Sequence, residues 1–136
     1  MRKKIIRTKI KEIKENLNLV SNHIPDTFKA FSGMGLVKDG IYKRVEFSIE
    51  NVFDICALIN TDLELGIPRD DRHIVENLTK NGILTKEMGK KLGVMKGFRN
   101  IVVHRYGKVN DKLAFRILKE NIEDFYDFIE EIEKLL

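Results

Sequence analysis

Residues 41–63 read IYKRVEFSIENVFDICALINTDL, and their apolar positions decide the fold class. Phe53 and Ile55 widen the apolar face of this stretch, and Gly66 and Pro68 supply the expected end. The stretch therefore predicts a long helix with one side buried in a core. Its apolar side chains recur three or four residues apart, which is the spacing of one helical face: Ile41, Val45, Ile49, Val52, Cys56, Ile59 and Leu63.

The same rhythm precedes this stretch. Pro25 should end a first helix, because proline cannot continue the hydrogen-bond ladder. A loop-rich piece containing Gly33, Gly35 and Gly40 should separate the two helices, with room for a short helical turn around residues 27–31. The apolar face of each predicted helix is called its seam below. The seam of the first helix consists of Ile6, Ile10, Ile13, Leu17, Val20 and Ile24.

Three further helices follow. A short one should run from Asp70 or Asp71 to Leu78, before the Asn81-Gly82 breaker. Thr85 is a plausible N-cap for the next helix, and Asn110 or Asp111 should cap a last helix that extends to Leu136. The chain is therefore predicted to be all-α: an antiparallel helical bundle of four long helices plus one short helix, in a single domain over residues 1–136. The seam of the fourth helix reads Met88, Leu92, Met95, Arg99, Val102 and Tyr106.

Composition narrows the class of protein. The formal net charge is +4, which permits a polyanionic partner without requiring one. The single cysteine, Cys56, excludes an intramolecular disulfide and lies in an apolar run, so we interpret it as a small buried hydrophobe. No apolar stretch is long enough to cross a bilayer and no signal-like block follows the N-terminus, so we expect no membrane association and a cytoplasmic location. Several helices are apolar on more than one flank, which favours a homodimer.

Arg99 interrupts the seam of the fourth helix, at a position where the spacing of three or four residues predicts an apolar side chain. A charge there is costly unless it is paired or faces a wet cleft. Two interpretations stay open: an ion pair with one of the many carboxylates, or a site that uses a guanidinium. His104 lies roughly 140° around a regular helix from Arg99, so the two would converge only at a helix end or across a dimer interface. Asn100 can face His104 at i, i+4, and Tyr106 shares the face of Arg99.

The run from Phe98 to Tyr106, FRNIVVHRY, closely resembles the HepT-like toxins of the HEPN superfamily. Its most specific part is the Arg-Asn-x3-His-x-Tyr pattern. Residues 42–46, residues 82–87 and the acidic-aromatic C-terminal stretch are similar to the corresponding parts of that family. The resemblance extends over most of the chain and is less distinctive over the first 40 residues.

The resemblance implies a ribonuclease toxin with a nucleotidyltransferase antitoxin of the MntA type. Arg99 and His104 would be catalytic in a homodimer groove, and Asn100 would support them. Tyr106 would be the residue to which the antitoxin adds AMP groups. RNA would be the substrate, and neither a metal nor a cofactor would be required.

The residue types suit this chemistry. A histidine that titrates near neutrality can take the proton of a ribose 2′-hydroxyl or protonate the leaving 5′-oxygen. A guanidinium can stabilise the added charge on the phosphorane better than an ammonium. The products would be a 2′,3′-cyclic phosphate and a 5′-hydroxyl. His23, His73 and His104 are dispersed and form no metal-ligand pattern, and the first two are interpreted as cap or surface residues.

Other functions fit part of the pattern. A non-catalytic HEPN partner of a nucleotidyltransferase would form a complex and cut no RNA. A plain nucleic-acid-binding helical module would bind in a salt-sensitive way without turnover. The basic residues of the first helix could contact RNA or form an ordinary solvated face, and the second is favoured because Glu12 and Glu15 interleave with them.

Overall fold

The computed structural model describes residues 1–103 and 109–136, and within them every regular element is a helix. The all-α prediction is therefore confirmed. The described helices are α1 Lys3–His23, α2 Phe28–Ser32, α3 Leu36–Asp62, α4 Asp71–Lys80, α5 Lys86–Val103, α6 Asp111–Asn121 and α7 Glu123–Glu133.

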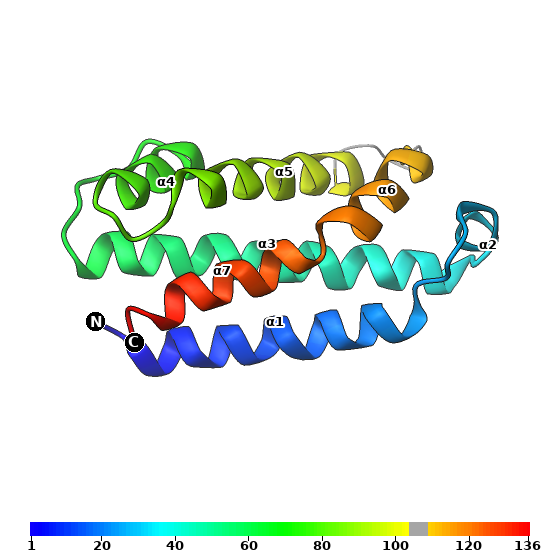
Figure 1. The fold of residues 1–136 in the computed structure, drawn as a ribbon, viewed down its shortest axis with the longest axis horizontal. Helices are drawn as coiled ribbons and strands as arrows, with labels where there is room; N and C mark the ends of the chain where they lie inside the picture. The colour runs from blue at the N-terminus through cyan, green and yellow to red at the C-terminus, as the bar shows by residue number, and fades with distance from the viewer. Residues whose placement is uncertain (104–108) are drawn as a thin grey trace.

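Helix α3 is the central element of the bundle. It packs against α1 on one side and against α4 and α5 on the other. Helix α7 crosses the bundle obliquely, so that the two chain ends lie near each other (Figure 1). Side-chain nitrogens of Lys3 and Arg7 approach the Leu136 carbonyl oxygen at 3.5 and 3.4 Å, which joins α1 to the C-terminus.

The predicted seams form the core. Five of the six seam residues of α1, from Ile6 to Val20, are buried, and so is the α3 seam from Ile41 to Ile59. Leu63 is the exception: it follows the end of α3 and its side chain is 39% exposed. The predicted caps Thr85 and Asn110 are also found, because their side chains accept hydrogen bonds from backbone N–H groups of α5 and α6. Asp70, predicted only as a possible start of the short helix, caps α4 in the same way.

Helix α3 begins earlier than the glycine pattern predicts. Gly35 precedes it with a φ of 59°, and Gly40 lies inside it rather than in a loop. A glycine inside a helix costs about 1 kcal/mol relative to alanine. Tertiary contacts offset that cost, because the first turns of α3 place Lys38 and Tyr42 against Asp111 of α6.

The last predicted helix is divided in two at Ile122. The backbone of Ile122 keeps α-helical angles (φ −64°, ψ −32°), so the chain bends there without leaving the helical region. Polar contacts accompany the bend: Asn121 donates to the carboxylate of the buried Asp124 at 3.1 Å, and Lys91 of α5 lies 3.8 Å from the same carboxylate. The prediction of four long helices and one short helix is therefore corrected: the last long helix is two helices, α6 and α7, and the short helix α2 is added.

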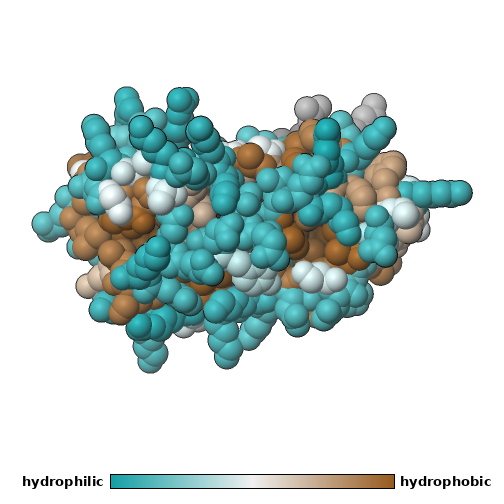
Figure 2. Space-filling model, viewed as in Figure 1, coloured by the Kyte–Doolittle hydropathy of each residue, from teal (hydrophilic) through white to brown (hydrophobic). Residues whose placement is uncertain are grey.

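The surface is mainly hydrophilic on the face drawn in Figure 2, with separate hydrophobic areas. The most exposed large apolar side chains include Leu36, Phe47 and Ile67. The homodimer stays a prediction. None of the described helices combines the length and the hydropathy that crossing a bilayer requires.

Candidate functional site

Arg99 lies near the C-terminal end of α5 and reaches the start of α4. Its Nη2 atom is 3.4 Å from the Oδ2 atom of Asp71, and its side chain is 24% exposed. The ion pair that the sequence left open is therefore present. The guanidinium is nevertheless only partly covered, so it also meets the condition for facing solvent.

Phe53 of α3 forms the other support of Arg99. The centroid of its ring is 5.7 Å from the guanidinium carbon, within the range of a cation–π contact. Phe53 and Asp71 together hold the guanidinium between α3 and α4. A guanidinium has five N–H donors, and its one hydrogen bond within residues 1–103 and 109–136 is to Asp71, so donors are left for an anion.

A second cluster connects the helices on either side of residues 104–108. Asp111, in the first turn of α6, accepts a hydrogen bond from Tyr42 Oη at 2.5 Å and one from Lys38 Nζ at 2.7 Å. The Tyr42 ring also packs edge-on against Phe98, the residue before Arg99, with centroids 6.2 Å apart. Tyr42 thus contacts the end of α5 and the beginning of α6 at once.

These contacts shift two pKa values in opposite directions. Burial, reinforced by the hydrogen bond to Asp111, raises the pKa of Tyr42, so its hydroxyl stays protonated. Burial works against ionisation of Asp111 as well, but the hydrogen bonds from Lys38 and Tyr42 outweigh it and lower the pKa of this carboxyl. The cluster is therefore a carboxylate held by two donors.

The sequence-predicted site residues are described to different extents. Arg99 is placed as above, and Asn100 is exposed on α5. His104 and Tyr106 lie outside the described residues, as does the predicted continuation of α5 as far as Tyr106. The 140° separation of Arg99 and His104 is consequently untested, and so are the roles of all four residues.

Sequence reasoning missed the partners of Arg99. Asp71 had been considered only for its place at the start of a helix, and Phe53 only as a widening of an apolar face. Neither has a local signal for contact with Arg99, since Asp71 is 28 positions away. The sequence singles out Tyr42 only as part of the stretch that resembles the family, and Asp111 only as a candidate helix cap.

The other histidines have structural positions. His23 lies at the end of α1, where its Nδ1 atom is 2.8 Å from the Leu19 carbonyl oxygen. His73 lies in the first turn of α4, and its Nδ1 atom accepts a hydrogen bond from the Arg69 backbone at 3.0 Å. The interpretation as cap and surface residues is confirmed. In the part of the chain that the structure describes, no three His, Cys, Asp or Glu side chains gather as metal ligands would.

Cys56 is fully buried in the core, as predicted. Burial, with a smaller contribution from the negative charge of Asp71, raises the pKa of its thiol. A thiol in this state is a poor nucleophile, so Cys56 belongs to the packing rather than to the chemistry.

Comparison with known proteins places these features in context. The model of the HepT-like family, described as Ribonuclease HepT-like, matches residues 8–132. The mRNA nuclease HepT of Shewanella oneidensis is 31% identical over 97 residues, which cover 71% of this chain and 73% of that protein.

Solved structures of toxin–antitoxin complexes contain chains with a similar fold. The crystal structure of a toxin–antitoxin with AMP-PNP contains a chain 28% identical to this one, with a TM-score of 0.88 over 96% of this chain and 98% of the other. A structure of a tri-AMPylated Shewanella oneidensis HEPN toxin in complex with MNT antitoxin gives a TM-score of 0.86 at 28% identity, covering 96% and 97% of the two chains.

Proposed function

The chain belongs to the Ribonuclease HepT-like family, and on that premise we propose that it is a metal-independent endoribonuclease, the toxin of a two-protein toxin–antitoxin system. The observation that carries the proposal is the set of contacts and the partial exposure of the Arg99 side chain. Its guanidinium lies on the apolar face of α5, held by one carboxylate and one aromatic ring. A quarter of its side chain is exposed, and Asp71 is its one hydrogen-bond partner among the described residues. This is the arrangement that a phosphate-binding arginine needs.

The reaction we propose is an intramolecular transfer at phosphorus. The ribose 2′-oxygen attacks the adjacent phosphorus while a base removes its proton. The new bond joins that oxygen to phosphorus, the bond from phosphorus to the 5′-oxygen breaks, and an acid protonates the 5′-oxygen as it leaves. Arg99 stabilises the extra negative charge of the phosphorane, and His104 transfers protons. Asn100 orients the imidazole from one turn earlier on the helix.

A second copy of the chain completes the proposed site. On a regular helix, Arg99 and His104 point roughly 140° apart, so one copy would not aim both at a single phosphate. A homodimer in which Arg99 of one protomer faces His104 of the other removes this difficulty. It would also cover some of the exposed apolar side chains, such as Phe47 and Val94.

Tyr106 is the proposed control point. Its phenol would lose its proton to a base as the oxygen attacks the α-phosphorus of ATP bound by an MntA-like nucleotidyltransferase antitoxin. The bond from that phosphorus to the bridging oxygen would break, and pyrophosphate would leave. The AMP group adds bulk and negative charge where an RNA phosphate has to bind, so the modified toxin is silent. The matched structure of a tri-AMPylated toxin with MNT antitoxin supports this part of the proposal. Both proteins would act in the cytoplasm.

The ribonuclease proposal is tested by incubating RNA with the wild type, Arg99→Ala and His104→Ala in excess EDTA. We expect the wild type to cleave and both variants to be inactive while their helical circular dichroism is unchanged. Equal cleavage by all three proteins would reject the assignment of the two residues.

The control by AMP is tested separately. The chain is co-expressed with a nucleotidyltransferase encoded beside it, and its intact mass is measured. Mass increases in AMP units that disappear in Tyr106→Phe are expected. An unmodified toxin that is inactive in a stable complex would instead favour a non-catalytic partner role.

A further inference from the structure

A groove of about 1070 Å³ runs between α4 and α5, outside the residues that sequence reasoning assigned to the site. Phe53, Val75 and Leu92 give it an apolar floor. Gly89 and Gly93 of α5 also line it, and a Cβ atom at Gly93 would meet no atom of another described segment within 4 Å. The groove is therefore kept open where α5 lacks side chains.

The rim of the groove is strongly basic. Among the described residues, six cationic side chains line it and Glu76 is the one carboxylate: the cations are Arg69, Arg72, Lys80, Lys86, Lys90 and Lys96. Arg72 pairs with Glu76 at 3.4 Å, and the other five form no ion pair with any carboxylate of residues 1–103 and 109–136. The groove lining thus has more positive than negative side chains, and Asp70, whose pKa is lowered mainly by a backbone hydrogen bond and in part by Lys96 and Arg69, is a further carboxylate near them.

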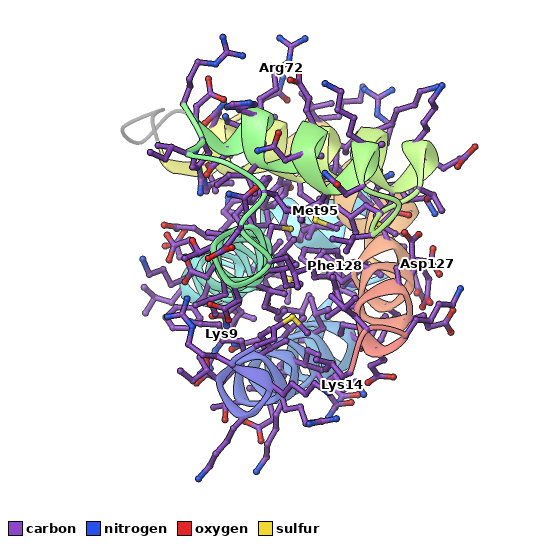
Figure 3. All side chains as sticks on the ribbon, turned by 90° about the vertical axis from the view of Figure 1, so that its left-hand side faces the viewer. Lys9, Lys14, Arg72, Met95, Asp127 and Phe128 are labelled. Carbon is purple, nitrogen blue, oxygen red and sulfur yellow. The ribbon has the colours of Figure 1, made fainter. Side chains whose placement is uncertain are left out.

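The basic face of α1 differs in this respect. Lys9, Lys11 and Lys14 each lie within ion-pair distance of a carboxylate, at 3.3, 3.9 and 3.6 Å. Figure 3 shows Arg72 on the outer side of the α4–α5 layer, at the opposite end of the view from Lys14 of α1. Among the described residues, three of the six lysine and arginine side chains of α1 form such pairs, against one of the six that line the groove.

The groove leads to Arg99. Phe53 is part of its floor, and the same ring lies against the Arg99 guanidinium. Lys96 lines the groove one helical turn before Arg99, and Asp71, the partner of Arg99, immediately precedes the lining residue Arg72. A chain of phosphates along the rim would therefore continue toward the guanidinium.

We propose that the α4–α5 groove binds a single-stranded segment of RNA and delivers it to Arg99. The cations on the rim would contact successive phosphates, and the apolar floor would receive a base. RNA fits better than an acidic protein segment, since the lining combines an apolar floor with cations along both helices. This inference rests on the proposed function for the identity of the nucleic acid.

The first experiment measures binding without cleavage. The probe is a short fluorescein-labelled oligouridylate with 2′-O-methyl riboses, which lacks the attacking hydroxyl. The variant Lys86→Glu/Lys90→Glu is compared with Lys4→Glu/Lys11→Glu, which makes the same change in net charge on α1. We expect the groove variant to weaken binding at least tenfold and to reduce the magnitude of the slope of log K against log salt concentration by about 1.4. The control should stay within about twofold of the wild type.

A second pair of variants changes the shape and leaves the charge unaltered. Gly93→Leu should fill the groove, and Gly40→Leu makes the same substitution at another helical glycine whose Cβ would have open space. Replacing a helical glycine does not lower helix propensity, so both variants are expected to fold. Gly93→Leu should weaken oligouridylate binding at least fivefold, and Gly40→Leu should not.

The outcomes separate this inference from the proposed function. Binding through the groove by a protein that cuts no RNA would uphold the inference and reject the ribonuclease. Cleavage and binding at wild-type level in both groove variants would reject the inference and leave the ribonuclease standing. Three other results would also overturn it. The first is that the α1 control variant weakens RNA binding as much as the groove variant. The others are a change in the oligomeric state of the groove variant by gel filtration, or loss of its antitoxin binding while RNA binding stays intact.

Discussion

The hydroxyl of Tyr42 donates a hydrogen bond to Asp111 Oδ1 across 2.5 Å, and this contact joins α3 to the first turn of α6. The same tyrosine ring packs against Phe98 at the end of α5. Residues 104–108, which carry His104 and Tyr106 of the motif, therefore connect two helix ends that share one fixed neighbour. The stability of the junction between α3, the end of α5 and the start of α6 should therefore depend on Tyr42 and Asp111.

Removing the Tyr42 hydroxyl tests that dependence. Tyr42→Phe should lower the free energy of unfolding by about 1.5–3 kcal/mol, because the charged carboxylate of Asp111 loses the hydrogen bond that Tyr42 donates. Urea unfolding followed by circular dichroism measures the change. Tyr126→Phe is the matched control, since Tyr126 has no hydrogen-bond partner among the described residues, and its effect should stay within about 0.5 kcal/mol. Equal effects at the two positions would contradict the account.

Asp111 should make stability depend on acid pH. Its pKa is lower in the folded protein than in the unfolded chain, whose value is about 3.9. The carboxylate therefore stabilises the fold fully above that pH, and the contribution is lost as the pH falls through the folded pKa. In Asp111→Asn, the free energy of unfolding should be lower at pH 6 and should fall less steeply between pH 5 and 2. Parallel pH profiles for the two proteins would contradict this.

The fold was predictable from the sequence where a single helical face decides burial. The buried faces of α1 and α3, apart from Ile24 and Leu63, and the caps Thr85 and Asn110 are found as predicted. The predicted loop at Gly40 and the predicted unbroken last helix across Ile122 were both wrong, for different reasons. The first is carried by the contacts of Lys38 and Tyr42 with Asp111, and the bend at the second keeps helical angles and leaves no break in the apolar rhythm.

The site was predictable only along one helix. The seam identified Arg99 as a charge that needs a partner, which is a local property of α5. Its partners Asp71 and Phe53 come from α4 and α3, and nothing in their own surroundings in the sequence marks them. The groove could not be seen either, because its cations come from both sides of the Asn81-Gly82 turn and become one surface only when α4 folds against α5.

Asp71 should act as a positioning residue for Arg99. Asp71→Asn keeps the shape of the side chain and removes the charge, so the guanidinium would no longer be held in one place. With RNA as substrate, kcat should fall about tenfold while KM changes less than twofold, a loss of about 1.4 kcal/mol in transition-state stabilisation. Asp71→Glu should recover part of kcat. Asp54→Asn, which breaks the exposed pair with Lys9, is the control and should leave kcat unchanged.

The composite site makes a prediction about mixed dimers. Arg99→Ala and His104→Ala should each be inactive alone. If the arginine of one protomer works with the histidine of the other, a mixed dimer has one intact site. Equal mixing with free exchange should restore about a quarter of wild-type activity, because half of the dimers are mixed and each has one working site. No recovery, with exchange verified by mass spectrometry, would assign both residues to one protomer.

The central claim is that this chain cuts RNA by 2′-oxygen attack, with Arg99 at the phosphate and without a metal. The most direct test is the mass of the fragments that the wild type releases from RNA in excess EDTA, beside the same sequence as DNA. The account predicts RNA fragments ending in a 2′,3′-cyclic phosphate, intact DNA, and no fragments from Arg99→Ala. Intact RNA in EDTA, cleaved DNA, or the same fragments from Arg99→Ala would contradict it.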